Sequence, residues 1–127
     1  MSSNESRPAL ILVVDDDMFV LRLIAEALSA DGYEVDTARN GREALEKTAA
    51  RLYDLILSDL RMPEVDGVAL YRELERREPR LLRRFAVVSG TTEMPEYASF
   101  LEETNVPLLG KPFRVEELQQ LVRRILG

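Results

Sequence analysis

Residues 9–17, ALILVVDDD, decide the fold, because an uninterrupted apolar run ends abruptly in three carboxylates. An apolar run of this length, rich in branched side chains, is typical of a β-strand that is covered on both faces. Over residues 18–30 the apolar side chains recur at helical spacing, and Asp31-Gly32 marks the end of that helix. The folded part of the chain therefore begins with a buried parallel strand that leads into a helix.

The same unit repeats along the rest of the chain, where four further runs of strand length each precede a segment with helical spacing. The further strands are predicted at 33–38, 55–58, 85–88 and 106–109, the last an edge strand because it contains Pro107. The further helices are predicted over 44–52, 68–74, 95–103 and 118–125. This alternation predicts an α/β fold of the flavodoxin-like, doubly wound type, with a five-stranded parallel sheet in the order 2-1-3-4-5 and five helices.

Length and composition exclude several classes of protein. The 127 residues suit one domain, predicted over 9–127 after a flexible tail or linker over 1–8. With 17 basic and 23 acidic residues the net charge is −6, so nucleic acid is not an expected partner. The absence of His and Cys excludes disulfides, Cys/His zinc sites and catalysis by the chain's own imidazole or thiolate. No stretch is long enough to span a membrane and no export signal is recognisable, so a cytoplasmic location is expected.

Chemically active side chains follow four of the five predicted strands. These are Asp15 and Asp16 after the first, Asp59 after the third, Ser89 after the fourth and Lys111 after the fifth. The carboxyl ends of the strands form the ligand-binding edge of such a sheet, where clustered carboxylates repel one another unless a cation lies among them. Mg²⁺ prefers oxygen ligands, and in a chain without His or Cys an aspartate is the best candidate for a covalent phosphoryl acceptor. The set therefore suits Mg²⁺ and a phosphoryl group.

Four motifs in this order resemble the response-regulator receiver domain of two-component signalling, the family of CheY-like domains. They are LVVDDD at 12–17, LSDLRMPEVDG at 57–67, VVSG at 87–90 and KPF at 111–113. The resemblance covers nearly the whole chain after the tail. Residues 89–111 are most similar to receivers at the C-termini of hybrid histidine kinases, so the chain is expected to be such a receiver, excised or free-standing.

The resemblance implies a role for each residue at the site. Asp59 would be the phosphoacceptor, while Asp15, Asp16, Asp59 and the backbone carbonyl of Arg61 would hold Mg²⁺. Lys111 would hold the phosphate, and the peptide bond that follows it would be cis.

The resemblance also implies a switch and a partner. Ser89 takes the place of the switch hydroxyl, and Thr91 and Arg61 lie where the family tunes the lifetime of the phosphoryl group. The donor would be a phosphohistidine on a histidine kinase or a phosphotransfer domain, and a homodimer is possible. One departure matters: Leu108 occupies the position where many receivers have the aromatic residue that reports phosphorylation, so an aromatic switch cannot be assumed.

Two other functions stay open at this stage. A receiver-like module could bind partners without being phosphorylated. A phosphohydrolase of the haloacid-dehalogenase type also has an apolar strand followed by Asp-x-Asp, but here Met18-Phe19 replace its small residue and Thr, and no cap domain fits in the chain. Two charged features are expected to be structural. Asp17 is predicted to cap the first helix, and a run of arginines at 76–84 is predicted to pair with neighbouring glutamates.

Overall fold

The predicted parallel sheet is present in the part of the chain that the computed structural model describes, residues 7–127. Every neighbouring pair of strands is parallel, and the order β2-β1-β3-β4-β5 is the predicted one. The strands are β1 (Leu10–Val14), β2 (Glu34–Ala38), β3 (Leu55–Ser58), β4 (Phe85–Ser89) and β5 (Leu108–Gly110). The predicted tail over 1–8 falls mostly on residues 1–6, which lie outside the described residues.

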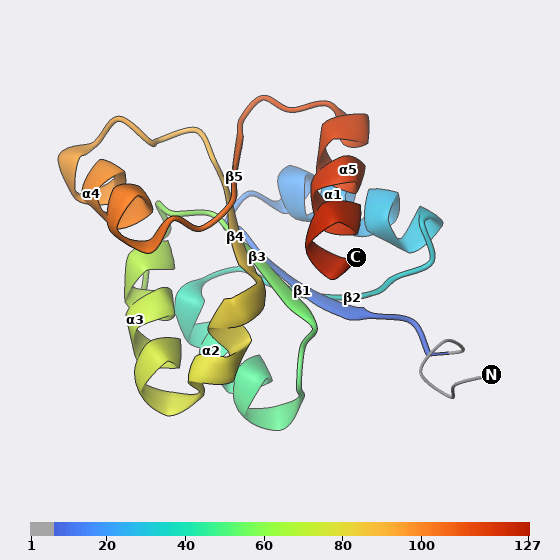
Figure 1. The fold of residues 1–127 in the computed structure, drawn as a ribbon, viewed down its shortest axis with the longest axis horizontal. Helices are drawn as coiled ribbons and strands as arrows, with labels where there is room; N and C mark the ends of the chain where they lie inside the picture. Colours follow the sequence, from blue (N-terminus) through green and yellow to red (C-terminus); the bar gives the residue numbers. More distant parts are fainter. Residues whose placement is uncertain (1–6) are drawn as a thin grey trace.

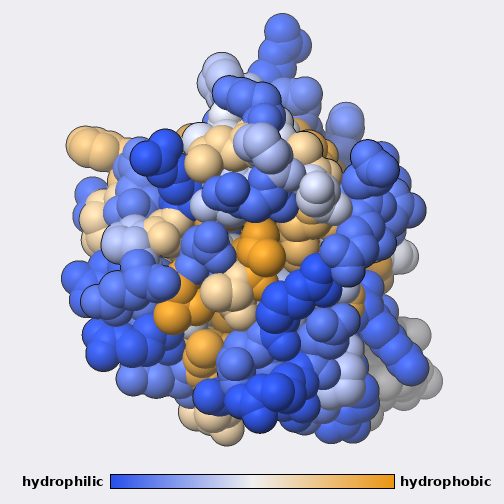
Figure 2. Space-filling view, turned by 90° about the vertical axis from the view of Figure 1, so that its left-hand side faces the viewer, coloured by the Kyte–Doolittle hydropathy of each residue, from blue (hydrophilic) through white to orange (hydrophobic). Residues whose placement is uncertain are grey.

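Helices cover both faces of the sheet (Figure 1). α1 and α5 pack on one face, and α2, α3 and α4 pack on the other. Figure 2 faces the side on which α3 and α4 lie, where apolar surface is surrounded by hydrophilic side chains. The helices are α1 (Met18–Ala30), α2 (Gly41–Ala50), α3 (Gly67–Arg77), α4 (Pro95–Thr104) and α5 (Val115–Leu126). None of the helices in residues 7–127 is long and apolar enough to cross a membrane.

β1 shows why the opening apolar run has no polar interruption. Leu12 and Val14 point into the core beneath α2, α3 and α4, whereas Ile11 and Val13 point into the core beneath α1 and α5. All four side chains are at most 1 % exposed. Because successive side chains of a strand face opposite ways, a strand between two helical layers needs an apolar residue at every position.

The structure differs from the sequence prediction on the carboxyl-terminal side of α3. A 3₁₀ helix, η2 (Pro79–Arg84), lies between α3 and β4 and was not predicted. It begins at a proline and buries only Leu81, so its six residues carry no helical periodicity. The fifth strand begins at Leu108 rather than at residue 106, because Pro107 has no N–H to donate to the sheet. The carbonyl of Pro107 still accepts a hydrogen bond from the Val87 N–H, at 2.8 Å.

The helix cap is confirmed, and the predicted pairing of the arginine run is confirmed for three of its five arginines. The Asp17 carboxylate caps α1 by accepting hydrogen bonds from the N–H groups of Phe19 and Val20, at 2.9 and 3.4 Å. In the arginine run, ion pairs join Arg76 and Arg77 to Glu73, and Arg80 to Glu78. The surface of α3 and η2 is therefore partly neutralised by its own glutamates.

Gly67, the first residue of α3, packs against the backbone that follows β3. Its N–H donates to the carbonyl of Leu60 at 2.8 Å, and a Cβ atom built on Gly67 would lie 2.2 Å from the carbonyl oxygen of Asp59. Since the contact is with backbone, no side chain can move aside to make room. Only glycine fits here without displacing the backbone of Asp59, the residue that follows β3.

We expect Gly67→Ala to lower the free energy of unfolding by about 1–3 kcal/mol, the usual cost of an overpacked site. Helix propensity alone would predict the opposite, a gain in stability, because alanine is favoured over glycine in helices. Urea denaturation measures the change. Gly110→Ala is the matched control, since a Cβ there meets no atom within 4 Å. Equal losses in the two variants would contradict the explanation by close approach.

Candidate functional site

The ladder of the sheet brings the predicted site residues to one edge. Asp15 directly follows β1 and Asp59 directly follows β3, and the Asp59 N–H donates to the carbonyl of Val14 at 2.9 Å. On the other side of β3, Ser89 ends β4, and its carbonyl accepts from the Lys111 N–H at 3.1 Å. Backbone hydrogen bonds between parallel strands thus fix the spacing of these residues, and Asp59, on the middle strand, lies between the others.

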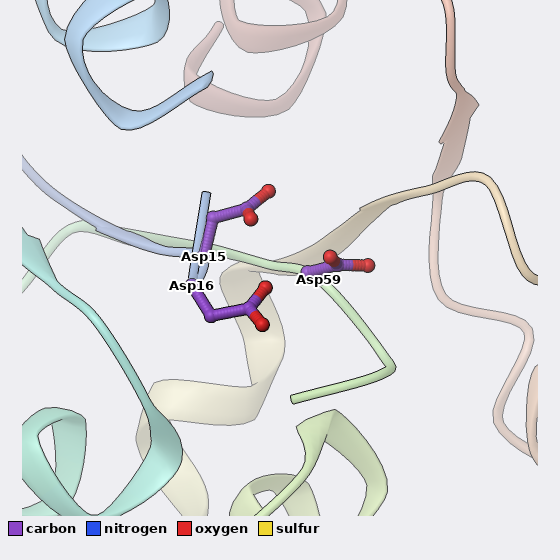
Figure 3. Close-up of side chains that lie close together, drawn as sticks. All are labelled: Asp15, Asp16 and Asp59. Atoms are coloured by element: carbon purple, nitrogen blue, oxygen red, sulfur yellow. The ribbon is translucent and has the colours of Figure 1, made fainter. Parts of the chain in front are cut away.

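Three carboxylates gather at this edge (Figure 3). One oxygen each from Asp15, Asp16 and Asp59 lies within 4.8 Å of the other two. Asp15 is 1 % exposed and Asp59 8 % exposed, whereas Asp16 is open to solvent. Oxygen ligands from both buried and exposed carboxylates are the donor set that Mg²⁺ takes in proteins, since this ion keeps several of its waters. The three side chains therefore fit a magnesium ion.

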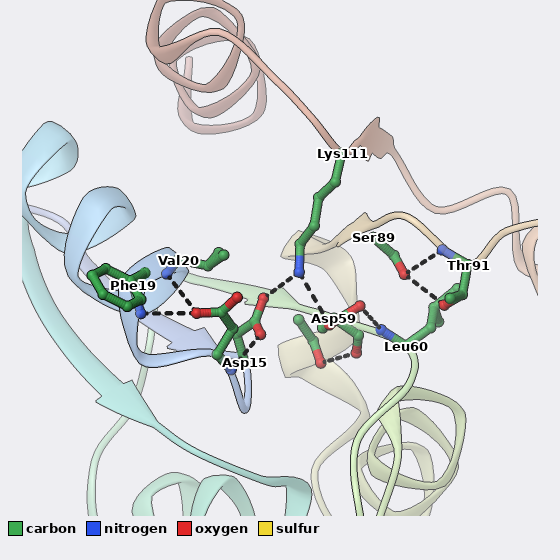
Figure 4. A network of polar contacts seen from close by, with 10 residues as sticks. Asp15, Phe19, Val20, Asp59, Leu60, Ser89, Thr91 and Lys111 are labelled. Carbon is green, nitrogen blue, oxygen red and sulfur yellow. Dashed lines mark hydrogen bonds and ion pairs between the residues drawn. The ribbon is translucent and has the colours of Figure 1, made fainter.

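Lys111 reaches across from the end of β5 into the carboxylate cluster (Figure 4). Its Nζ lies 2.7 Å from Oδ2 of Asp15 and 3.2 Å from Oδ2 of Asp59. Burial raises the pKa of Asp15, although the hydrogen bond from Lys111 opposes that shift. Burial would lower the pKa of Lys111, but its hydrogen bond to Asp15 and the charge of Asp59 raise it overall. The lysine is held as an ammonium, yet three carboxylates still leave excess negative charge here.

The remaining oxygens of the two buried carboxylates accept backbone hydrogen bonds. Oδ1 of Asp59 accepts from the Leu60 N–H at 2.7 Å, and Oδ1 of Asp15 accepts from the Asp17 N–H at 2.9 Å. Sequence patterns do not reveal these two donors, because any residue except proline offers an N–H. They orient the carboxylates toward the lysine and toward each other.

Ser89 and Arg61 lie at the site but do not contact the carboxylates through side-chain hydrogen bonds in the described residues. The hydroxyl of Ser89 is buried and lies 3.2 Å from Oγ1 of Thr91 (Figure 4). Arg61 is exposed in the loop between β3 and α3. The Lys111–Pro112 peptide bond is cis, as predicted. Leu108, which stands in the aromatic position, is 44 % exposed at the start of β5.

Comparison with known proteins agrees with this geometry. The family model of the response regulator receiver domain matches residues 11–123. The DNA-binding transcriptional regulator NtrC of Escherichia coli K12 is 32 % identical over 118 residues, which are 93 % of this chain and 25 % of NtrC. The chain thus spans only about a quarter of the length of this relative.

Solved structures show the same fold over most of the chain. The chemotaxis response regulator CheY4 of Vibrio cholerae has a TM-score of 0.84 and 30 % identity, covering 94 % of this chain and all of CheY4. The response regulator TrrA of Thermotoga maritima, solved in complex with Mg²⁺ and beryllium fluoride, has a TM-score of 0.77 and 32 % identity. It covers 93 % of this chain and 99 % of its own.

The family match favours the receiver domain over the phosphohydrolase. Four observations support a receiver domain: the order of the strands, the acidic cluster, the lysine that contacts it and the match to the family model. The chain belongs to the response regulator receiver domain family, and it is a phosphoacceptor of two-component signalling rather than a turnover enzyme.

Proposed function

We propose that Asp59 is the residue that takes the phosphoryl group, from a phosphohistidine on a histidine kinase or a phosphotransfer domain. The observation that carries this assignment is the central position of Asp59. Its carboxylate lies 3.2 Å from the ammonium of Lys111 and within 4.8 Å of oxygens of both other carboxylates. Asp15 is almost fully buried, and Asp16 makes no ion pair in the described residues. Asp59 alone combines the lysine contact with some exposure to an incoming donor.

The transfer forms one bond and breaks another. An oxygen of Asp59 attacks phosphorus, and the bond between phosphorus and the imidazole nitrogen breaks, with its electron pair left on that nitrogen. The product is an acyl phosphate on Asp59. Phosphoryl transfer of this kind depends mainly on positioning and on neutralisation of charge, and the orientation of Asp59 by the Leu60 N–H supplies the first of these.

Mg²⁺ would be held by the carboxylates of Asp15, Asp16 and Asp59. The backbone carbonyl of Arg61, in the loop after β3, would be a further ligand. When bound, the ion supplies positive charge that offsets the excess of carboxylates and the phosphoryl oxygens. The acidic cluster and the magnesium in the TrrA structure support this part of the proposal.

Lys111, which also contacts Asp15, and Ser89 would hold the phosphoryl oxygens. The ammonium of Lys111 already lies 3.2 Å from Asp59, so a phosphoryl group there comes within its reach. Ser89 would exchange its contact with Thr91 for a hydrogen bond to a phosphoryl oxygen. Both groups act by charge or hydrogen bonding and neither takes part in covalent chemistry.

The wider setting of the domain stays a prediction. Residues 9–127 are proposed as the receiver unit, acting in the cytoplasm where its kinase would present the phosphohistidine. Origin at the C-terminus of a hybrid histidine kinase rests only on the likeness of residues 89–111, whereas the relatives named above are response regulators. A homodimer is likewise a prediction only.

Acetyl phosphate with Mg²⁺ should add one phosphoryl group to the protein, a mass increase of about 80 Da in intact-protein mass spectrometry. Asp59→Asn should abolish the increase, because the amide cannot attack phosphorus. Asp17→Asn is the control: it removes a neighbouring carboxylate yet retains a helix cap. A wild-type protein with no added mass would favour the receiver-like module that binds without phosphorylation.

Magnesium should raise the melting temperature, because an ion that binds only the folded state adds stability, about 2.7 kcal/mol at one hundred times its Kd. Asp16→Asn should remove most of this shift, since it deletes the exposed carboxylate of the cluster. Differential scanning calorimetry measures this shift in melting temperature by comparing MgCl₂ with NaCl of equal ionic strength. An undiminished shift in Asp16→Asn, or the same loss in Asp17→Asn, would place the ion elsewhere.

A further inference from the structure

α4 is joined to α3 by two aromatic side chains that face inward. Tyr97 is 4 % exposed and Phe100 2 % exposed. Phe100 packs edge-on against Tyr71 of α3, with the ring centroids 5.0 Å apart. The hydroxyl of Tyr97 donates to Oδ2 of Asp66 at 3.2 Å. Met94, which precedes α4, offers no side-chain cap, and the Tyr97 hydroxyl makes a polar contact near the beginning of this helix.

Asp66 connects this contact to the phosphoacceptor. The residue after it, Gly67, donates its N–H to the carbonyl of Leu60 at 2.8 Å and lies against the backbone of Asp59. The Leu60 N–H in turn donates to Oδ1 of Asp59 at 2.7 Å. A continuous set of short contacts therefore runs from the Asp59 carboxylate through the start of α3 to Tyr97.

Phosphorylation acts on the first contact of this set. An acyl phosphate removes the charge from the Asp59 carboxylate, and this weakens the hydrogen bond that its Oδ1 accepts from the Leu60 N–H. At the other end, burial and the charge of Asp66 raise the pKa of Tyr97, so its phenol remains a donor. The hydrogen bond of 3.2 Å is long for a phenol and a carboxylate, and a small displacement of the loop is enough to break it.

We propose that Tyr97 is a positioning residue that, through its hydrogen bond to Asp66, couples the phosphorylation state of Asp59 to the position of α4. The inference rests on the proposed function of Asp59 and adds a route that does not need an aromatic residue at Leu108. Because coupling between two sites is reciprocal, Tyr97 also affects how tightly the Asp59 site holds a phosphoryl analogue.

The test uses the full chain with Tyr97→Phe, which keeps the ring in the core and removes only the hydroxyl. Tyr71→Phe is the matched control, because the Tyr71 hydroxyl has no hydrogen-bond partner among residues 7–127 and its ring lies in the same interface. Asp66→Ser is a second variant that retains a capping oxygen for α3 but shortens the link to α4. Hydrogen exchange by mass spectrometry follows the peptides over 93–105, with and without Mg²⁺ and beryllofluoride.

In the wild type, beryllofluoride should change exchange over α4. Without ligand, Tyr97→Phe should raise exchange there about fivefold, the factor expected for one lost hydrogen bond, and most of the ligand-dependent change should disappear. Asp66→Ser should behave in the same way and Tyr71→Phe like the wild type. Of the two tyrosine variants, only Tyr97→Phe should change the affinity for beryllofluoride, and the change should be severalfold.

Two results would overturn the inference while leaving Asp59 as phosphoacceptor. One is a ligand-dependent change over α4 that is as large in Tyr97→Phe as in the wild type. The other is an equal effect of Tyr71→Phe, which would show that packing rather than the hydrogen bond carries the coupling. A wild-type protein that takes up neither beryllofluoride nor a phosphoryl group would instead refute both proposals, and the mass measurement identifies that case.

Discussion

The ammonium of Lys111, placed between the carboxylates of Asp15 and Asp59, is the interaction on which the site depends. A parallel sheet directs the ends of neighbouring strands to the same edge, so carboxylates that follow β1 and β3 must lie close together and repel one another. The lysine enters from the far strand, β5, and offsets part of that repulsion. One ammonium does not neutralise three carboxylates, so this edge of the sheet keeps an excess of negative charge. That excess attracts a cation.

The sequence predicts the sheet and most of its functional edge for a physical reason. The apolar run that ends at Val14 is readable because both faces of β1 are buried. The strand then stops where the side chains become charged, and the topology rule places Asp15, Asp59, Ser89 and Lys111 at one edge without further information. The family resemblance added a role for each of these residues. It also predicted the cis peptide bond after Lys111, which the structure contains.

Other features depend on contacts that a linear pattern does not encode. The 3₁₀ helix before β4 is too short to show a period, and the later start of β5 follows from the missing N–H of Pro107. The Leu60 N–H that orients Asp59 is a backbone group, which every residue type but proline provides. Tyr97 reads as one more core aromatic residue in α4, and only the fold shows that its hydroxyl meets Asp66, the residue that caps α3.

The alternation of β1 between two cores has a consequence for how this protein can change. Leu12 and Val14 belong to one core and Ile11 and Val13 to the other, and the same backbone register sets where Asp15 emerges. Losing a single residue from β1 would exchange the two sets of side chains and draw the first carboxylate back into the sheet. A change of length within β1 is therefore far more disruptive than one in the loops that connect the strands and helices.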